Sequence, residues 1–311
     1  MVLTKTPPPT DHTLRLSFDG NAVVRQRSLA TPGPWILVPD RARQAIDEFL
    51  EAGTALSDIA PPALGVKTGA DPVLVGALVD TQDGMARVRF GEIETIIEQS
   101  VLRSALRGRD IGPFSAASTH VVLWTHSDYG DCRSTLPPCA GRYVSRNGQV
   151  LRNRADYRAG PLWTLFRTRS ACATHRVVWP DIARRPRSVA LEASAVPNAI
   201  PLNTCYIAVA PSRSTALVIT AVLNSTWSAA YTAVTADEAR GGYRRLNARN
   251  MGALPIPDGE EAHRSLSELS QQAHQLEHAD QDELDDAVAG ALALSQGTQA
   301  QLRELAHRRG V

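Results

Sequence analysis

Three tight-turn signals divide the first half of this chain into pairs of short strands. They are Asp19-Gly20-Asn21, Asp83-Gly84 and Asn147-Gly148. Asn, Asp and Gly adopt positive φ at low cost, so such turns favour hairpins between antiparallel strands. Patterns typical of helices dominate from about residue 214 onward. The order predicts an α+β fold, with a mixed or antiparallel sheet carrying hairpins, packed helices and an α-helical C-terminal tail.

Apolar spacing and capping residues place the remaining elements. Asp40 is a suitable N-cap for a helix over about 41–53, and a mostly apolar helix is predicted over about 214–232. Ala262, Leu266, Leu269, Ala273 and Leu276 are spaced by 4, 3, 4 and 3 residues, which is the seam of an amphipathic, coiled-coil-like helix. Further predicted elements are strands near 120–124, 162–167, 175–179 and 204–209 and helices near 281–293 and 297–309.

Shifts in composition divide the chain into three expected parts. These are an N-terminal segment with a hairpin over 1–33, a main domain over 34–257 and a helical C-terminal tail over 258–311. No apolar run approaches the roughly 20 residues of a membrane helix, and the first residues lack the apolar stretch of a signal peptide. The expectation is a cytoplasmic protein without a membrane partner.

The stretch from Gly65 to Val75 predicts a polar loop that leads into an apolar strand. Its two glycines are four residues apart and flank Lys67 and Thr68. Glycines of this kind allow backbone N–H groups and an ammonium to approach an anion. The alternative is an ordinary connecting turn, because the spacing of a phosphate-binding P-loop is not met.

The net charge of +1 conceals a strong separation of signs along the chain. Residues 101–187 contain fifteen Arg against five Asp and no Glu, whereas residues 258–311 contain eleven acids against four Arg. A basic middle and an acidic tail indicate a body that binds a polyanion and a helical tail that does not touch it. The alternative is a solvated surface in an arginine-rich protein.

The cysteines and tryptophans are predicted to have structural roles. Cys132, Cys139, Cys172 and Cys205 have no CxxC spacing and are expected to be small buried hydrophobes. His126, Cys132 and Cys139 resemble the start of a zinc site, but a fourth ligand is missing. Trp124, Trp163 and Trp179 are expected in the core, although an exposed one would be able to stack on a base.

No catalytic constellation emerges from the sequence. There is no GxSxG or HExxH motif, and Pro180-Asp181 with Glu192 lacks the lysine of a nuclease site. The closest approach to a methyltransferase tetrapeptide, Leu136-Pro137-Pro138-Cys139, has an aliphatic where a carbonyl or carboxylate must accept the amino group's hydrogen bond. It also lacks the aromatic that would stack on a flipped base.

Several segments in this order nevertheless resemble the C-terminal specificity region of TaqI-like and Eco57I-like adenine-N6 DNA methyltransferases, which serve restriction-modification and phage defence. The family often has Asn at the position of Asp71 and an aromatic at that of Leu74. The resemblance spans about residues 34–308. The matching segments are Pro34-Trp35, residues 65–71, residues 106–111, Leu223-Asn224-Ser225, residues 241–247 with Leu254-Pro255-Ile256-Pro257, and residues 284–288 before Leu294-Ser295.

The resemblance implies a target recognition domain that grips duplex DNA and reads a sequence, without methyl transfer of its own. S-adenosylmethionine is then expected on a catalytic domain outside this chain, in a separate subunit or lost. Basic groups supply phosphate contacts, while Arg, Asn and Thr on loops suit guanine and adenine edges. The candidate contacts are Lys67, Thr68, Arg103, Arg107, Arg109, Arg244, Arg245, Asn247 and Asn250. Each has the alternative of a surface charge or a turn-stabilising side chain.

Two other functions fit the same sequence. One is a non-catalytic assembly subunit that docks a methyltransferase or nuclease through its seam helix and never touches bases. The other is the remnant of a broken gene. Affinity for duplex DNA separates the first from a recognition domain, and an intact catalytic gene next to this one argues against the second.

Overall fold

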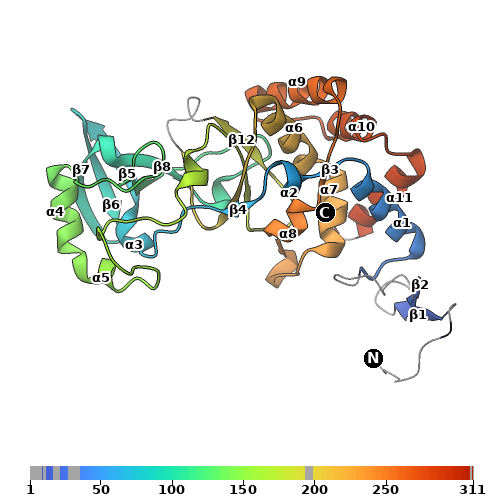
Figure 1. Ribbon diagram of the computed structural model, residues 1–311, viewed down its shortest axis with the longest axis horizontal. Helices are drawn as coiled ribbons and strands as arrows, with labels where there is room; N and C mark the ends of the chain where they lie inside the picture. Colours follow the sequence, from blue (N-terminus) through green and yellow to red (C-terminus); the bar gives the residue numbers. More distant parts are fainter. Residues whose placement is uncertain are drawn as a thin grey trace.

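The computed structural model describes residue 9, residues 12–16, 22–26, 36–192 and 199–308, and residue 310. These residues form an elongated molecule with a sheet-rich lobe at one end, a helical lobe at the other and a small sheet between them (Figure 1). The mixture of helices with largely antiparallel sheets confirms the predicted α+β class.

The sheet lobe is built on a six-stranded sheet with the order β13-β8-β9-β5-β6-β7. All neighbours are antiparallel except β13 and β8, which are parallel. The predicted hairpin at Asp83-Gly84 is confirmed, since it joins β5 to β6. The elements are α3 (Asp71–Leu74), β5 (Val75–Gln82), β6 (Met85–Phe90), β7 (Ile93–Glu98), β8 (Leu102–Leu106), β9 (His120–Leu123), α4 (Pro138–Arg146), α5 (Gly148–Arg152) and β13 (Ile200–Pro201).

A four-stranded sheet separates the two lobes. Its order is β12-β10-β14-β4, all antiparallel. Because side chains alternate along a strand, Val177 and Trp179 enter the core of the helical lobe, while Val178 enters that of the sheet lobe. One sheet therefore belongs to both cores and ties the lobes together. Its strands are β4 (Ala63–Leu64), β10 (His175–Pro180), β12 (Val189–Glu192) and β14 (Cys205–Val209).

The helical lobe surrounds the apolar helix α6. Two short ladders, β3 with β16 and β11 with β15, connect its loops. The elements are α1 (Asp40–Glu51), β3 (Thr54–Ala55), α2 (Leu56–Ile59), β11 (Ile182–Ala183), α6 (Arg213–Asn224), α7 (Thr226–Thr235), β15 (Arg244–Arg245), α8 (Ala248–Gly252), β16 (Pro255–Ile256), α9 (Glu260–Leu276), α10 (Gln281–Ala291) and α11 (Gln296–Arg308).

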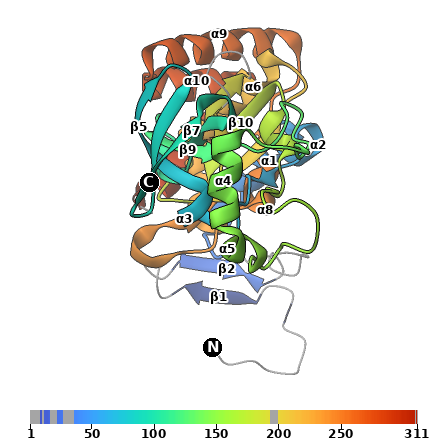
Figure 2. The same ribbon diagram turned by 90° about the vertical axis from the view of Figure 1, so that its left-hand side faces the viewer.

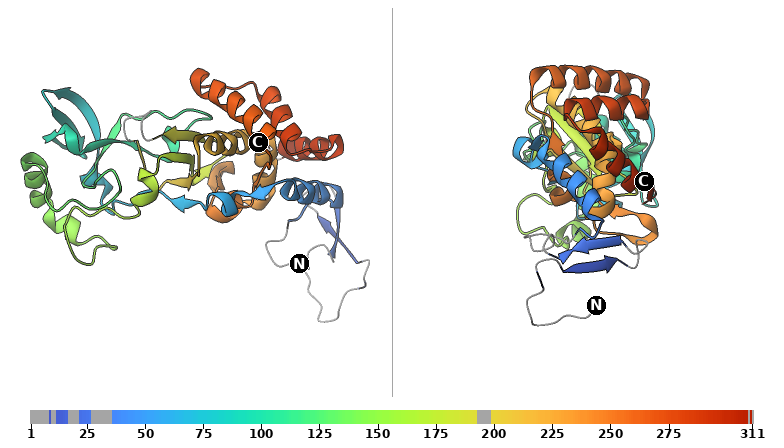
Figure 3. Two further views of the ribbon diagram at one scale, coloured as in Figure 1. Left: turned by 45° about the horizontal axis from the view of Figure 1, so that its top comes forward. Right: turned by 90° about the vertical axis from the view of Figure 1, so that its right-hand side faces the viewer.

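The acidic C-terminal helices cover this lobe. Helix α9 lies along α6, and α11 packs against α1 and α7 (Figure 3). The seam predicted on α9 is therefore used inside the chain, since Leu266 and Ala273 are buried in the core of the helical lobe. Leu276, at the end of the seam, remains exposed.

The N-terminal hairpin stands at the edge of the helical lobe. Strands β1 (Thr13–Leu16) and β2 (Ala22–Arg25) pair antiparallel, and Val24 is buried against Leu14 and Leu37 (Figure 2). The predicted turn residues Asp19-Gly20-Asn21 lie outside the described part of the chain, as do Pro34 and Trp35.

The hairpin predicted at Asn147-Gly148 is wrong, because these residues join helices α4 and α5. A type I′ turn requires positive φ at both positions, but Asn147 has φ −96°. Its side-chain amide donates instead to the carbonyl oxygen of Tyr143, at 2.9 Å. Burial of Tyr143, Val144 and Leu151, at helical spacing, outweighed the turn propensity of the dipeptide.

The helix predicted over 214–232 is two helices that meet at 63°. Ser225 is extended (φ −73°, ψ 157°), and its hydroxyl accepts from the N–H of Ser228, which caps α7. No single helix in the described ranges is long and apolar enough to span a membrane, and only the bent pair of α6 and α7 reaches that length and hydropathy.

Other expectations were partly wrong. Residues 71–74 form helix α3 instead of the start of a strand. Residues 162–167 contain one isolated bridge, between Lys67 and Phe166. Trp124 and Trp179 are buried as expected and Trp163 is half-buried. Among the cysteines only Cys205 is buried, because the other three lie in or beside irregular segments.

Candidate nucleic-acid interface

The glycine loop, residues 65–71, is shaped by contacts within the protein. A Cβ at Gly65 would lie 2.3 Å from the carbonyl oxygen of Leu202, and Gly69 has φ +69°. The N–H groups of Gly65, Val66 and Lys67 donate to the carbonyl oxygens of Cys205, Pro201 and Phe166. These three amides are therefore not available to an anion, and Gly65 is required by close backbone packing.

Arg154 holds this loop from below. It is 4% exposed and donates to the carbonyl oxygens of Leu151, Thr164, Leu162 and, at 2.8 Å, Thr68. Burial lowers the pKa of its guanidinium, and the nearby Tyr157 and Asp156 oppose that change. An arginine that the charge pattern assigned to a polyanion surface is thus a structural group.

The polar side chains of the loop differ in accessibility. Lys67 is partly exposed and forms an ion pair with Asp156. Thr68 is 2% exposed and hydrogen-bonds to Asp71, so its side chain does not face a duplex in this conformation. Lys67 remains a candidate phosphate contact, whereas Thr68 stabilises the turn.

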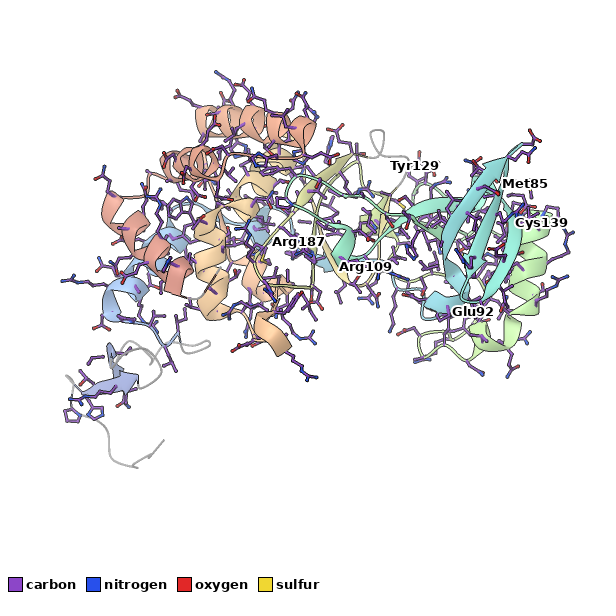
Figure 4. All side chains as sticks on the ribbon, turned by 180° about the vertical axis from the view of Figure 1, so that it is seen from behind. Met85, Glu92, Arg109, Tyr129, Cys139 and Arg187 are labelled. Carbon is purple, nitrogen blue, oxygen red and sulfur yellow. The ribbon has the colours of Figure 1, made fainter. Side chains whose placement is uncertain are left out.

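The next candidate segment, residues 107–110, forms the short 3-10 helix η3 (Gly108–Asp110). Arg107 lies 4.0 Å from Asp71 and so joins this turn to the glycine loop, while Arg109 projects outward and is 64% exposed. Arg187 braces the turn from the central region by donating to the carbonyl oxygens of Gly108 and Ile111. Arg109 and Arg187 both lie between the lobes (Figure 4).

Thr204 connects the 107–110 turn to strand β15. Its hydroxyl accepts from the N–H of Gly108 at 3.0 Å, and its carbonyl oxygen accepts from the N–H of Asp181. Asp181 in turn lies 3.5 Å from Arg245, which is 54% exposed. The fold therefore brings together three groups of candidate residues that lie far apart in the sequence.

The candidates that follow β15 are mainly structural. Asn247 caps helix α8 by accepting from the N–H of Asn250 at 3.1 Å. Asn250 is 2% exposed and donates to the carbonyl oxygen of Arg245, so it is not placed to read a base. Arg244 is partly exposed beside Arg245.

Arg103 lies apart from this group, at the opposite end of β8 from Arg107. Its guanidinium donates to the carbonyl oxygen of Leu102 and lies 3.4 Å from Asp128. Near it, Tyr129 is 83% exposed on a turn fixed by hydrogen bonds to Ser127 (Figure 4). The structure does not unite Arg103 with the other candidate contacts.

Cations outnumber carboxylates where the lobes meet. The hydrogen bond from Lys67 lowers the pKa of Asp156 most, burial raises it, and the charge of Lys67 lowers it further. The charge of Arg167 also lowers this pKa, which places Arg167 in the same region. Arg184 lies 5.4 Å from the ring centre of Tyr243, next to β15. We name this region the basic waist: Lys67, Arg107, Arg109, Arg167, Arg184, Arg187, Arg244 and Arg245, with the carboxylates Asp71, Asp110, Asp156, Asp181, Asp237 and Glu238, the last two beside β15.

The arginine-rich middle does not form a single surface. Arg154 and Arg176 are buried, and both donate to carbonyl oxygens. Arg142 and Arg146 lie on α4, at the far side of the sheet lobe (Figure 1). The basic surface predicted for the whole middle of the chain is therefore limited to the basic waist.

Sequence reasoning overlooked Arg89 and His120 beside the waist. The alternation Ala86-Arg87-Val88-Arg89-Phe90 carried the signal, since it places both arginines on one face of β6 and the apolar side chains on the other. Burial lowers the pKa of His120, and the charges of Arg107 and Arg109 lower it further. His120 is therefore within electrostatic reach of two candidate contacts.

The described residues contain no group of three or more His, Cys, Asp or Glu side chains arranged for a metal. The ring nitrogens of His126, the residue considered for zinc, contact the hydroxyl of Thr125 and the N–H of Leu165. Burial lowers its pKa to about 4, so the ring is neutral near pH 7. Of residues 136–139, Pro137 is the N-cap residue of helix α4, and Pro138 and Cys139 are the first two residues of that helix.

Two of the segments that carried the sequence resemblance make structural contacts. The side chain of Asn224 accepts from the N–H of Ser188 at 2.7 Å and donates to its carbonyl oxygen at 3.1 Å. The carbonyl oxygen of Leu254 accepts from the N–H of Leu56, next to the ladder of β16 with β3. These segments therefore make contacts within the protein.

Comparison with known proteins gives a fold relationship. Neither a scan against family models nor a search of curated proteins finds a match. Among solved structures, the type IIL restriction-modification enzyme MmeI in complex with DNA is similar over 83% of this chain and 36% of its own, with 11% identity and a TM-score of 0.49. The type IIG restriction endonuclease BpuSI is similar over 92% of this chain and 35% of its own, with 14% identity and a TM-score of 0.53. The chain thus spans about a third of these proteins, and it has the fold of one part of a restriction endonuclease.

Proposed function

We propose that this chain is the DNA-binding target recognition part of a site-specific adenine-N6 DNA methyltransferase in a restriction-modification system. Methyl transfer and S-adenosylmethionine binding belong, in this proposal, to a catalytic domain that this chain does not contain. The observation that carries the proposal is the basic waist, where the glycine loop, the 107–110 turn and strand β15 meet through Asp71, Thr204 and Asp181.

Charge supports a duplex as the ligand. The waist has eight cations against six carboxylates, and Arg109 and Arg245 are more than half exposed. Arginine forks suit phosphate oxygens and guanine edges. The acidic helices α9 to α11 pack on α1, α6 and α7 of the helical lobe (Figure 1). The fold shared with BpuSI is consistent with this role.

The rival function, docking through the seam of α9, finds less support. The seam residues Leu266 and Ala273 already pack inside the chain, in the core that α6 also forms. A partner helix would have to displace that contact. We therefore favour DNA binding over assembly through this helix.

The test is a titration of the full chain with a mixed-sequence 30-base-pair duplex at several salt concentrations. Replacing Arg107 and Arg109 with Gln is expected to weaken binding to all sequences and to reduce the salt slope by about two, since each phosphate contact contributes roughly 0.9. The control is Arg41→Gln with Arg264→Gln, which removes the same charge from exposed positions on α1 and α9. If the two double variants have the same affinity and salt slope, the basic waist is not part of the DNA-binding surface.

A further inference from the structure

A cleft of about 370 Å³ lies beside the basic waist, between α3 and the outward face of the six-stranded sheet. Two arginines and a histidine from three different segments line it. Residues that matter for its chemistry are Asp71, Ala77, Arg89, Gly91, Arg107 and His120.

Strand register explains how the cleft is formed. On β5, Ala77 pairs with Arg89 of β6 on one side and with His120 of β9 on the other. Directly paired residues point to the same face of a sheet, so a methyl group forms the floor between two longer side chains. Core residues Val88 and Phe90 point the opposite way.

The walls of the cleft carry an excess of positive charge. Arg107 is 25% exposed and lies 4.0 Å from Asp71, a separation that leaves guanidinium N–H groups free for a second acceptor. Arg89 is exposed, and although Glu94 of β7 is its paired neighbour on the same face, no ion pair engages Arg89 within the described ranges. Asp71 is the single carboxylate in the cleft, and its other oxygen is hydrogen-bonded to Thr68.

We propose that this cleft binds a phosphate group, gripped by Arg89 and Arg107 and contacted by His120. The guanidinium fork matches phosphate oxygens, and Ala77 and Gly91 leave room for an anion between the side chains. The inference rests on the proposed function in one respect, that the phosphate is a phosphodiester of bound DNA. The same chemistry would hold a free phosphate, and the experiment separates the two.

His120 makes phosphate binding in the cleft dependent on pH. The charged groups around it are Arg107, Arg109 and Asp110, together with Arg89 and Asp71 of the same cleft, and its Nδ1 lies 3.4 Å from the hydroxyl of Thr119. Burial and the charges of Arg107 and Arg109 lower its pKa and Asp110 opposes them, so the surroundings disfavour the imidazolium in the free protein. A bound phosphate favours the imidazolium, and binding therefore strengthens as the pH falls through the pKa of the complex.

The experiment compares Arg89→Gln with Arg87→Gln in the full chain. Arg87 lies two residues earlier on the same face of β6 and outside the cleft, so it is a matched control with the same change in charge. We expect Arg89→Gln to weaken binding of a 30-base-pair duplex roughly 5- to 10-fold at 0.1 M salt and to reduce the salt slope by about one, with Arg87→Gln within twofold of the parent. If the two substitutions weaken binding equally, the cleft is not a phosphate site, and the proposal that the chain binds DNA is not affected by this result.

His120→Gln supplies a second readout. The parent is expected to bind the duplex more tightly at pH 5.5 than at pH 8, and the variant to lose most of that dependence. NMR titration of the His120 ring should show its pKa rising when the duplex is added, which a purely structural role would not produce. An unchanged ring pKa in the saturated complex contradicts the proposal.

Failure of the proposed function gives a different result. If the parent does not bind duplex, the same NMR titration is run with inorganic phosphate and with pyrophosphate. A rise in the His120 pKa that Arg89→Gln abolishes then identifies a free phosphate as the ligand. No response to any of the three anions overturns the inference.

Discussion

The guanidinium of Arg154 donates a hydrogen bond of 2.8 Å to the carbonyl oxygen of Thr68, from a residue eighty-six positions away. This contact fixes the glycine loop against helix α5. We expect Arg154→Met to lower the free energy of unfolding by about 2–4 kcal/mol, because several buried carbonyl groups lose their donor. Arg152→Met, on the exposed side of α5, is the control, and both are measured by urea denaturation. Equal stability of the two variants contradicts the assigned role.

Gly65 is required because the backbone of residues 201 and 202 approaches it closely. Gly65→Ala places a Cβ 2.3 Å from one carbonyl oxygen and 2.6 Å from the other, so the unfolding free energy should fall by about 1–3 kcal/mol. Gly290→Ala, in α10 with open space around its position, should instead stabilise by up to about 1 kcal/mol. Thermal melts of the two variants should shift in opposite directions.

Glu98 links the edge strand β7 to the start of helix α4. Its carboxylate accepts from the N–H groups of Cys139 at 2.7 Å and Ala140 at 2.9 Å. Burial raises its pKa, but these hydrogen bonds outweigh that effect, and the net pKa is lowered from 4.5. We expect Glu98→Gln to reduce the unfolding free energy at pH 7 by about 0.5–1 kcal/mol, since this is a partly exposed helix cap.

The pH dependence of this effect has a definite sign. A carboxyl whose pKa is lower in the folded state stabilises the protein above its unfolded pKa, and loses that stabilisation as the pH falls through its folded pKa. The difference between the parent and Glu98→Gln should therefore be constant above about pH 5 and shrink below pH 4.5. Glu94→Gln, on the exposed face of β7, serves as the control. If the difference in unfolding free energy grows as the pH falls, Glu98 does not cap helix α4 in the way described.

Asp285 ties α10 to the first turn of α7. Its carboxylate accepts from the N–H of Thr226 at 2.8 Å and from the side chain of Gln281 at 3.0 Å, and the residue is buried. Asp285→Ala should lower the unfolding free energy by about 2–3 kcal/mol, because a buried N–H loses its acceptor at a helix N-terminus. The neighbouring Asp286 is exposed and pairs with Arg303, so Asp286→Ala should cost less than about 1 kcal/mol. Denaturation midpoints of the two variants test the contrast.

Prediction from sequence worked best where one short segment held the whole signal. The hairpin at Asp83-Gly84 follows from local turn propensity, and helix α1 from its apolar spacing. Asp40 as the N-cap of that helix was wrong, because Pro39 is the N-cap residue, no side chain caps the helix, and Asp40 is its first residue. Prediction also failed at Asn147-Gly148, where packing of Tyr143 and Leu151 outweighed the turn preference, and at Ser225, where a cap divides one apolar pattern into two helices. For the candidate site it singled out Arg107, Arg109 and Arg245, which the fold places in the basic waist, but not Arg89 or His120, which line the neighbouring cleft.

The sequence by itself determined the α+β class, the separation of a basic middle from an acidic tail, and the longer helices α1, α9, α10 and α11, because these depend on composition and on residues within a few turns of each other. Only the tertiary structure decided which arginines are surface groups. Arg154 is enclosed by carbonyl groups, whereas Gly108 beside Arg107 is bonded to Thr204, ninety-six residues further on, and Arg245 is linked to Thr204 through Asp181. Charge patterning carries no information about which distant backbone carbonyls will surround a guanidinium, since that depends on how the two cores pack against the sheet between them.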